Sequence, residues 1–241
     1  MDASEIDAVV FDMGGVFIIP NPVPVCAALT DAGIDIEMTV TQAHDAHYTG
    51  VRAITDRLAA EDVDETKPDV WHHYDMAYFG SVGLDGDELR RACDARDRLR
   101  RRDEVTDLWT QRIEHNVSGF AEVASLRPVA IVTNNIGTAV EQCQQHGICQ
   151  IGSGPLPSVE AIVDSTVVGV SKPDPRIFQP ALDALGTAAD RTLYVGDTVH
   201  ADVRGATAAG MPVVQLDPLD LHADHDHWRL PDLVALAELL R

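Results

Sequence analysis

Apolar residues follow two different patterns along this chain, and each pattern predicts a different kind of structure. Short uninterrupted apolar runs are typical of strands that are buried on both faces of a parallel sheet. Such runs occur at residues 8–11, 128–132, 192–195 and 212–216. Between about residues 25 and 109 the apolar positions recur at helical spacing instead. Helices are therefore predicted at 25–32, 40–58, 69–79 and 87–99.

Strands and helices are predicted to alternate after residue 117. Helices are expected at 117–126, 137–146, 176–185, 199–209 and 230–240, with short additional strands at 148–151 and 159–163. This alternation is typical of a doubly wound parallel sheet. We therefore expect an α/β protein with a Rossmann-like core at 1–19 and 114–241 and an all-helical domain inserted at 20–113. Three prolines between residues 20 and 24 predict an irregular connector at the start of this insertion.

Polar residues end three of the predicted buried strands. Asp12 ends the first strand, Thr133 and Asn134 end the second, and Asp197 ends a third. The carboxyl ends of parallel strands lie at one edge of the sheet, where open α/β sheets bind their ligands. Asp202 follows Asp197 by about one helical turn, so we expect three carboxylates to lie close together at this edge.

The residue types at this edge predict a phosphoryl-transfer site. Neighbouring carboxylates repel one another unless a cation neutralises them. All-oxygen ligands with room for water favour magnesium over zinc. Thr133 and Asn134 can donate hydrogen bonds to anionic oxygens, and Lys172 supplies a compact positive charge. A carboxylate nucleophile, a hard cation and these donors are the parts that phosphoryl transfer uses.

The charge balance and the cysteines restrict the partners and the compartment. The chain has 39 Asp and Glu residues against 18 Lys and Arg residues, a formal net charge of -21, which argues against nucleic-acid and anionic-membrane partners. No apolar run is long enough to span a bilayer, and the amino terminus has no secretory signal. The four cysteines form no Cys-x-x-Cys pair, which is typical of reduced thiols. A cytoplasmic protein is therefore expected.

Four stretches of the chain resemble, in order, the motifs of the haloacid dehalogenase-like hydrolase superfamily. They are VVFDMGGV at 9–16, IVTN at 131–134, GVSKPDPRIF at 169–178 and VGDTVHAD at 195–202. The stretch GATAAGM at 205–211 also matches. The resemblance covers about residues 6–19 and 115–241, and it implies that the helical insertion is the all-helical cap of this family. Such a cap closes over the site, excludes water and selects the substrate.

The resemblance also implies a role for each motif residue. Asp12 would be the nucleophile that forms an aspartyl intermediate. Magnesium would be held by Asp12, the Gly14 carbonyl and Asp197, with Asp202 orienting the metal site.

The transferred phosphate would be bound by Thr133, together with Asn134, and Lys172 would stabilise charge beside the nucleophile. These roles imply a magnesium-dependent hydrolase, and a phosphatase of a small phosphorylated metabolite is the leading interpretation.

Gly14 departs from the pattern of this family. Most of its phosphatases carry a second aspartate two residues after the nucleophile, which protonates the leaving group and later activates water. A glycine offers a carbonyl to magnesium but moves no proton, which leaves open a catalytically weakened binding or regulatory protein. The dehalogenase branch also lacks this aspartate, but it carries tyrosine there and works without a metal. Because the chain keeps Asp197 and Asp202, a 2-haloacid dehalogenase is a less favoured alternative.

Other candidate groups are interpreted as structural. His200 could replace the missing base but is interpreted as an exposed residue of a helix start. Histidines of the insertion are similar candidates, namely His44, His47, His72 and His73. The stretch 222–227, HADHDH, is interpreted as an acidic surface loop. The arginines between residues 90 and 102 are interpreted as a solvated helix face whose charges pair with nearby acids. Substrate identity and oligomeric state are left open.

Overall fold

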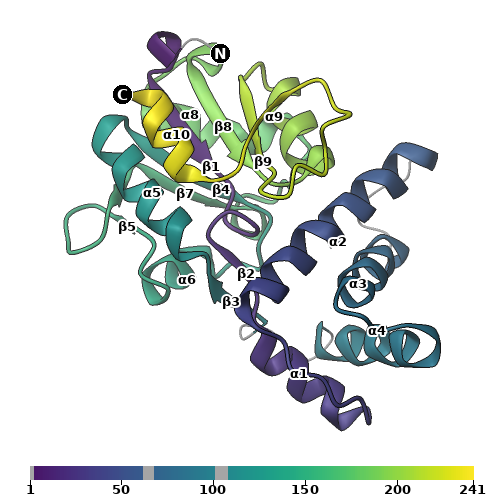
Figure 1. Cartoon of the computed structure of the whole chain (residues 1–241). Helices are drawn as coiled ribbons and strands as arrows, with labels where there is room; N and C mark the ends of the chain where they lie inside the picture. Colours follow the sequence, from purple (N-terminus) through teal and green to yellow (C-terminus); the bar gives the residue numbers. More distant parts are fainter. Residues whose placement is uncertain (1–2, 62–67, 101–107) are drawn as a thin grey trace. The chain divides into compact units, whose positions relative to one another are not determined.

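The computed structural model describes residues 3–61, 68–100 and 108–241, and the chain divides into two compact units (Figure 1). The α/β unit consists of Met1–Phe17 and Arg112–Arg241. The helical unit is the segment between them, Ile18–Gln111. None of the helices within the described ranges has the length and apolar character needed to cross a bilayer.

A six-stranded parallel sheet forms the centre of the α/β unit, which confirms the predicted fold class. Its strands lie in the order β10-β9-β8-β1-β4-β7. Their bounds are Ala8–Phe11 for β1, Val129–Thr133 for β4, Ala161–Asp164 for β7, Thr192–Gly196 for β8, Val213–Leu216 for β9 and Trp228–Leu230 for β10. The central strand is thus β1, the strand that leads to Asp12, with β8 on one side and β4 on the other.

Both faces of β1 are buried because its side chains alternate between two hydrophobic layers. On one face, Val10 packs in a cluster that includes Phe178 and Tyr194. On the other face, the Phe11 ring lies 5.3 Å from that of Phe120 and 5.8 Å from that of Phe17, measured between ring centroids. This two-sided burial explains why an uninterrupted apolar run predicted the strand correctly.

Helices and short turns cover the two faces of the sheet (Figure 1). The α-helices are α5 (Glu114–Leu126), α6 (Ala139–Gln145), α7 (Ser165–Val168), α8 (Gln179–Leu185), α9 (Gly205–Ala208) and α10 (Leu233–Leu240). Three-residue or four-residue 3-10 turns occur at Ala3–Glu5, Pro175–Phe178 and Ala189–Arg191, and a π-helical turn occurs at Val199–Arg204. The helices expected at 176–185 and 199–209 therefore begin as tighter and wider turns, respectively, than an α-helix.

Asn116 fixes the loop that follows Asp12 to the helices beside it. This buried side chain of α5 donates from Nδ2 to the Val16 carbonyl at 2.8 Å and accepts at Oδ1 from the Leu233 amide at 3.0 Å. Helices α5 and α10 lie side by side in Figure 1. They approach so closely that a Cβ on Gly119 would lie 2.5 Å from the Leu233 carbonyl carbon. The loop after the central strand is thus held by well-packed neighbours.

The structure corrects the prediction of an irregular connector around residues 20–24. Ile18–Pro20 is a strand, β2, which pairs with β3 at Trp109–Arg112. Pro22 begins helix α1 (Pro22–Asp31), where the Asn21 side chain accepts from the Val23 amide. A proline disrupts the interior of a helix but not its first turn, whose amides have no intrahelical partner.

The short strands of the α/β unit differ in part from those predicted from the sequence. The strand expected at 148–151 is the short β5 (Gln150–Ile151), which pairs with β6 (Ser158–Val159) in a separate two-stranded sheet. The strand expected at 159–163 corresponds largely to β7 of the main sheet. The edge strand β10 was not predicted, because Trp228–Leu230 is short and contains an arginine.

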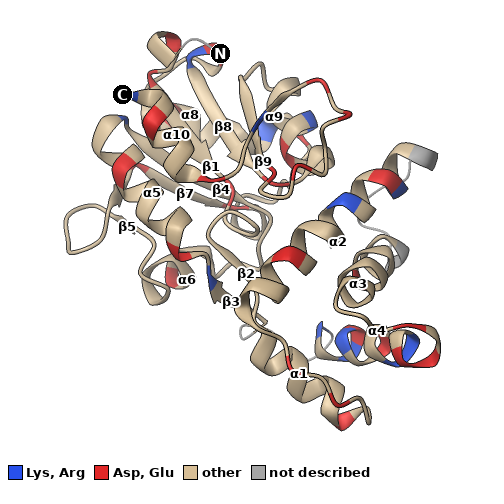
Figure 2. Cartoon of the chain, in the orientation of Figure 1, with Lys and Arg blue, Asp and Glu red and all other residues tan. Residues whose placement is uncertain are grey.

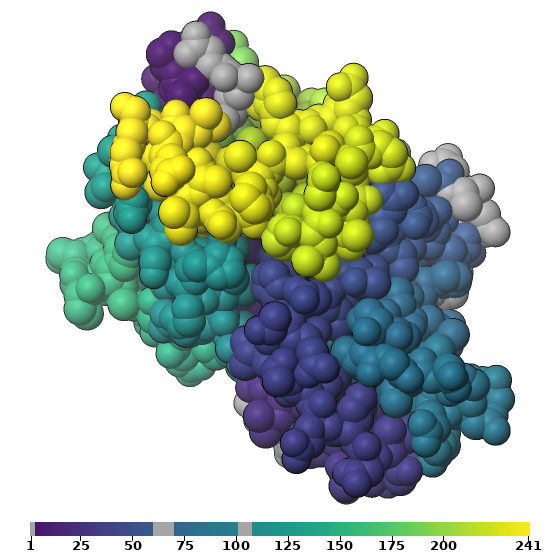
Figure 3. Space-filling view, viewed as in Figure 1, coloured from purple at the N-terminus to yellow at the C-terminus, as the bar shows by residue number. Residues whose placement is uncertain are grey.

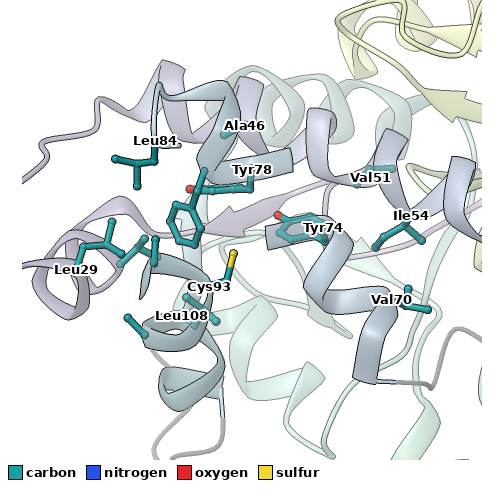
Figure 4. Close-up of a cluster of buried hydrophobic side chains, with 14 of the residues drawn as sticks. Leu29, Ala46, Val51, Ile54, Val70, Tyr74, Tyr78, Leu84, Cys93 and Leu108 are labelled. Carbon is teal, nitrogen blue, oxygen red and sulfur yellow. The ribbon is translucent and has the colours of Figure 1, made fainter. Parts of the chain in front are cut away.

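Four helices of the helical unit surround a hydrophobic cluster of their own (Figure 4). They are α1, α2 (Val40–Glu61), α3 (Pro68–Ser81) and α4 (Gly86–Arg100). Leu29, Val51, Tyr74 and Tyr78 belong to this cluster, each at most 2% exposed. The apolar residues that recur at helical spacing in the insertion thus pack together in one hydrophobic core.

Arg96 contradicts the interpretation of the arginines as a solvated helix face. Helix α4 carries acids and arginines along its length (Figure 2), and Arg90 does pair with Asp87 as expected. Arg96, however, is 2% exposed, and its guanidinium lies 4.1 Å from the centroid of the Tyr78 ring. Its Nε lies 3.4 Å from Oδ1 of Asp75 on α3. Arg96 is buried because it packs against helix α3, and the sequence pattern within α4 gives no sign of this contact. Arg101 and Arg102 lie outside the described residues.

His47 is expected to make the helical unit less stable in acid. Its ring is 2% exposed and Nδ1 lies 2.7 Å from the Tyr74 hydroxyl. Burial, together with the charge of Arg96, lowers the pKa of His47 from 6.5 to about 3. In the unfolded chain His47 becomes protonated below about pH 6.5, whereas in the folded chain it becomes protonated only near pH 3. The free energy of unfolding therefore falls as the pH falls through this window.

Urea unfolding at about pH 7 and about pH 5 tests this expectation, with the signal taken from the helical unit. His47→Gln, which does not titrate, is expected to lose a substantial part of the pH dependence. An exposed histidine, His73, provides the matched variant His73→Gln. An unchanged pH dependence in His47→Gln would show that other groups cause the acid sensitivity.

Candidate active site

Three aspartates meet at the carboxyl edge of the sheet, as the strand ends predicted. Asp12 follows β1, Asp197 follows β8, and Asp202 lies in the turn Val199–Arg204. Each can offer one oxygen such that the three oxygens lie within 4.8 Å of one another, and all three residues are buried. Among the residues that the structure describes, this is the group of three or more acids, histidines or cysteines with metal-binding geometry.

Lys172 pairs with two of these acids. It is 3% exposed, and its Nζ lies 2.7 Å from Oδ1 of Asp12 and 2.7 Å from Oδ1 of Asp202. A buried ammonium is costly to desolvate unless it is paired, and here two carboxylates pair with it. The structure therefore brings together side chains from three distant stretches of the sequence, which were predicted to share one site: Asp12, Lys172, and the pair Asp197 and Asp202.

Asp202 uses both of its oxygens within the protein. Oδ1 accepts from Lys172 Nζ at 2.7 Å and from the Tyr194 hydroxyl at 2.9 Å. Oδ2 accepts from the amide and the hydroxyl of Thr198 at 2.9 and 2.7 Å. A carboxylate offers about four acceptor positions. This arrangement favours the orienting role of Asp202 over direct coordination of a metal.

Tyr194 belongs to the site although the sequence analysis did not select it. Its hydroxyl contacts Asp202, accepts from Lys172 Nζ at 2.9 Å, and lies 3.3 Å from the Val132 carbonyl. The residue is fully buried in the middle of β8, between Leu193 and Val195. The signal was available, because a buried tyrosine hydroxyl needs a hydrogen-bond partner.

The acids of the cluster are not neutralised by the protein alone. Burial, with repulsion from Asp202 and Asp197, raises the pKa of Asp12 to about 7 although Lys172 opposes the shift. Burial and repulsion from Asp202 raise the pKa of Asp197 well above its ordinary value. For Asp202, burial acts in the same direction, but Lys172 and Thr198 outweigh it and lower the pKa.

A divalent cation fits this donor set. Three carboxylates and one ammonium leave an excess of two negative charges when all are ionised. Hard oxygen donors with this charge suit magnesium. Asp12 and Asp197 are the carboxylates that would hold such an ion. The Gly14 carbonyl stays a predicted ligand.

Thr133 and Asn134 take different positions at the edge of the sheet. Thr133 is the last residue of β4, 3% exposed, and it stays a prediction as a phosphate donor. Asn134 instead holds the backbone of Lys172: its Oδ1 accepts from the Lys172 amide at 2.8 Å, and its Nδ2 donates to the Lys172 carbonyl at 3.1 Å. These contacts hold the Lys172 backbone in place, and Asn134 stays a prediction as a phosphate donor because its Nδ2 carries a second hydrogen.

Histidines near the site are placed only in part as expected. His200 is half-buried, and its Nδ1 lies 3.1 Å from Arg204 Nη1, so this nitrogen accepts from the guanidinium. The stretch 222–227 is not wholly a surface loop. His222 is 2% exposed and its Nδ1 lies 3.4 Å from Oδ1 of Asp217, a buried carboxylate that also accepts from the His222 amide.

The sequence of this chain is similar to those of known hydrolases. A family model described as haloacid dehalogenase-like hydrolase matches residues 6–210. A phosphoserine phosphatase of Thermus thermophilus is 42% identical over 96 residues, which are 37% of this chain and 38% of that protein. The chain thus matches less than two fifths of the length of this curated relative.

Two solved structures share the fold over nearly the whole chain. The hydrolase YfnB of Bacillus subtilis, solved bound to magnesium, has a TM-score of 0.60 at 19% identity and covers 98% of this chain and 99% of its own. A 2-haloacid dehalogenase of Pseudomonas syringae has a TM-score of 0.53 at 20% identity and covers 98% of each chain. At such identities the likeness shows the fold alone. The family match over most of the chain confirms the resemblance of the motifs: the protein belongs to the haloacid dehalogenase-like hydrolases.

Proposed function

We propose that the protein is a magnesium-dependent phosphatase of a small phosphorylated metabolite and that Asp12 is its nucleophile. The observation that carries this proposal is the contact of Lys172 with two of three buried aspartates at the strand ends. The name of the phosphoserine phosphatase that matches part of the chain supports phosphate as the transferred group. The helical unit is proposed to be the cap that selects the substrate.

In the first step Asp12 attacks the phosphorus of the substrate, a bond forms from a carboxylate oxygen to phosphorus, and the bond to the leaving oxygen breaks. The Lys172 ammonium and the Thr133 hydroxyl stabilise the negative charge on the equatorial oxygens of the phosphoryl group. Bound magnesium supplies positive charge that screens the phosphate from the acids. Water then attacks the aspartyl-phosphate, which releases phosphate and restores Asp12. Asp202, Tyr194 and Asn134 keep Lys172 in place through both steps.

One assay separates this function from the two alternatives. The purified protein is incubated with an aryl phosphate and with a short 2-haloacid, each with magnesium and with a chelator. Phosphate release that requires magnesium supports the phosphatase. Halide release that resists the chelator supports a dehalogenase, whereas phosphate-analogue binding without turnover supports a binding protein. The free cysteines of the described chain fit the proposed cytoplasmic location.

The absence of an acid at position 14 predicts a steep dependence on the leaving group. Aryl phosphates, whose phenolates leave without a proton, should be cleaved well, whereas alkyl phosphates should be cleaved poorly. General acid–base assistance contributes roughly 10²–10⁴-fold, so Gly14→Asp is expected to raise alkyl phosphate turnover by up to about this factor. The left-handed backbone of this turn is carried by Gly15, with φ of 69°, and Gly14 is not among the positive-φ glycines of the described chain.

The measurement is kcat/KM for one aryl and one alkyl phosphate in the wild type and in folded Gly14→Asp. Met13→Leu is the control for disturbance of the turn, because it replaces the neighbouring buried side chain with one of similar volume. If the wild type cleaves both esters equally fast, another group supplies the proton and Gly14 is no catalytic deficit.

A further inference from the structure

A fully buried glutamine lies beside the acidic cluster and has no part in the mechanism described above. Gln215 is 0% exposed and lies near the end of β9. In the sheet it is level with Gly196 of β8 and with Arg229 of β10, so it stands at the same edge as the site. A buried amide must satisfy both of its ends, which makes its partners informative.

The partners of Gln215 connect Asp197 with a histidine of the loop after β9. Its Nε2 donates to the Asp197 carbonyl at 2.8 Å, and its Oε1 lies 2.7 Å from Nε2 of His227. Because a carbonyl only accepts, the amide nitrogen must face Asp197 and the amide oxygen must face His227. His227 therefore carries its proton on Nε2. Burial and the neighbouring cationic groups lower the pKa of His227 to about 4, so the ring is neutral at neutral pH.

The peptide group that joins Asp197 to Thr198 is held on both sides. Its oxygen accepts from Gln215 at 2.8 Å, and its N–H donates to Oδ2 of Asp202 at 2.9 Å. Two buried side chains thus fix the plane of the peptide that directs the Asp197 carboxylate. Asp202 also pairs with Lys172, so one carboxylate contacts both the peptide beside Asp197 and the ammonium beside Asp12.

We propose that Gln215 is a positioning residue for the metal ligand Asp197 and that His227 holds Gln215 in its working orientation. The proposal rests on the magnesium site proposed above. It gives the loop after β9 a role in the site, since the loop supplies the second partner of Gln215.

Hydrogen bonds within the loop and to β10 hold the segment that carries His227. Asp217 accepts from the Leu221 and His222 amides, each at 2.9 Å. Arg229 donates from Nη1 to the His225 carbonyl at 3.0 Å. The loop, residues 217–227, forms part of the surface that Figure 3 shows in yellow-green, whereas Gln215 is fully buried. Changes at the surface of the loop can therefore reach the metal ligand through one hydrogen-bonded side chain.

The test measures binding of magnesium alone to the purified full chain by isothermal titration calorimetry. Outer partners of a metal ligand typically change affinity by roughly 10–100-fold. Gln215→Met keeps the length and removes both hydrogen bonds, so we expect magnesium affinity to fall by about 10-fold or more. His227→Phe, which leaves Gln215 in place, should lower affinity in the same direction by a smaller factor.

Two further variants separate positioning from a general structural role. His227→Gln restores a donor toward Gln215 and is expected to recover most of the affinity lost in His227→Phe. His225→Phe changes the neighbouring ring, whose centroid lies 5.6 Å from that of His227, and should leave the affinity unchanged. If Gln215→Met fails to fold, the two His227 variants decide the question.

The proposal is overturned if folded Gln215→Met or His227→Phe binds magnesium as the wild type does. It is also overturned if His227→Gln and His227→Phe lose affinity equally, or if the wild type binds no magnesium. Because no substrate is present, a wild type that binds magnesium but releases no phosphate contradicts the proposed phosphatase activity and leaves this test intact.

Discussion

Asp12→Asn is expected to abolish phosphate release while the protein remains folded. The amide has nearly the size of the carboxylate but is a poor nucleophile, so turnover should fall by roughly 10³-fold or more. The amide also resembles the protonated acid, which burial and neighbouring acids favour, as the raised pKa of Asp12 shows. Metal-free Asp12→Asn should therefore be at least as stable as the wild type at about pH 8, where ionised Asp12 weakens the folded state.

The measurements are phosphate release and thermal unfolding, with Asp183→Asn as the matched change at an exposed aspartate. Acid quenching of the wild type during turnover should trap a phosphorylated peptide that contains Asp12, and the variant should give none. Retention of more than a few per cent of the activity by the purified variant would remove Asp12 from the role of nucleophile.

Lys172→Met is expected to lower both turnover and the stability of the metal-free protein. Loss of one charge-stabilising group of this kind costs roughly 10²–10³-fold in kcat. Methionine fills a similar volume but leaves three buried aspartates without their ammonium. Breaking a buried ion pair on one side typically costs about 3–5 kcal/mol, which is a large part of the stability of a domain.

Magnesium should restore much of the stability of Lys172→Met because a divalent cation replaces the missing positive charge. We therefore expect the melting temperature to rise with magnesium by more in the variant than in the wild type. Arg176→Met is the control, since the Arg176 side chain in the same loop is 76% exposed in its ion pair with Asp174, and such pairs contribute little. An unchanged turnover with a large loss of stability would restrict Lys172 to a structural role.

The acidic site could be predicted because its residues end strands that are apolar on both faces. A run such as 8–11 shows where the strand ends, and the parallel arrangement then brings Asp12 and Asp197 to one edge. This inference needs only the fold class. Thr133 was placed at the same edge for the same reason.

The residues that hold the site in place were harder to predict because they depend on register and on contacts between distant segments. That Asn134 also holds the Lys172 backbone could not be predicted, because it depends on how the loop of Lys172 approaches the end of β4. Tyr194 and Gln215 were visible as polar side chains within apolar strands. Their partners follow from neighbouring strands and from a loop that no periodicity describes. The same limit explains why Arg96 was wrongly interpreted as solvated.

The position of β1 in the sheet has a consequence for synthesis and folding. The strand is made first, yet its two neighbours, β4 and β8, begin only at Val129 and Thr192. Until residue 196 has left the ribosome, β1 can pair with β4 at most, and its edge toward β8 stays open. An apolar strand with an open edge is the kind of segment that aggregates. Chains that stop before β8 should therefore be insoluble, and the nucleophile reaches its working position only after β8 (Thr192–Gly196) has been added.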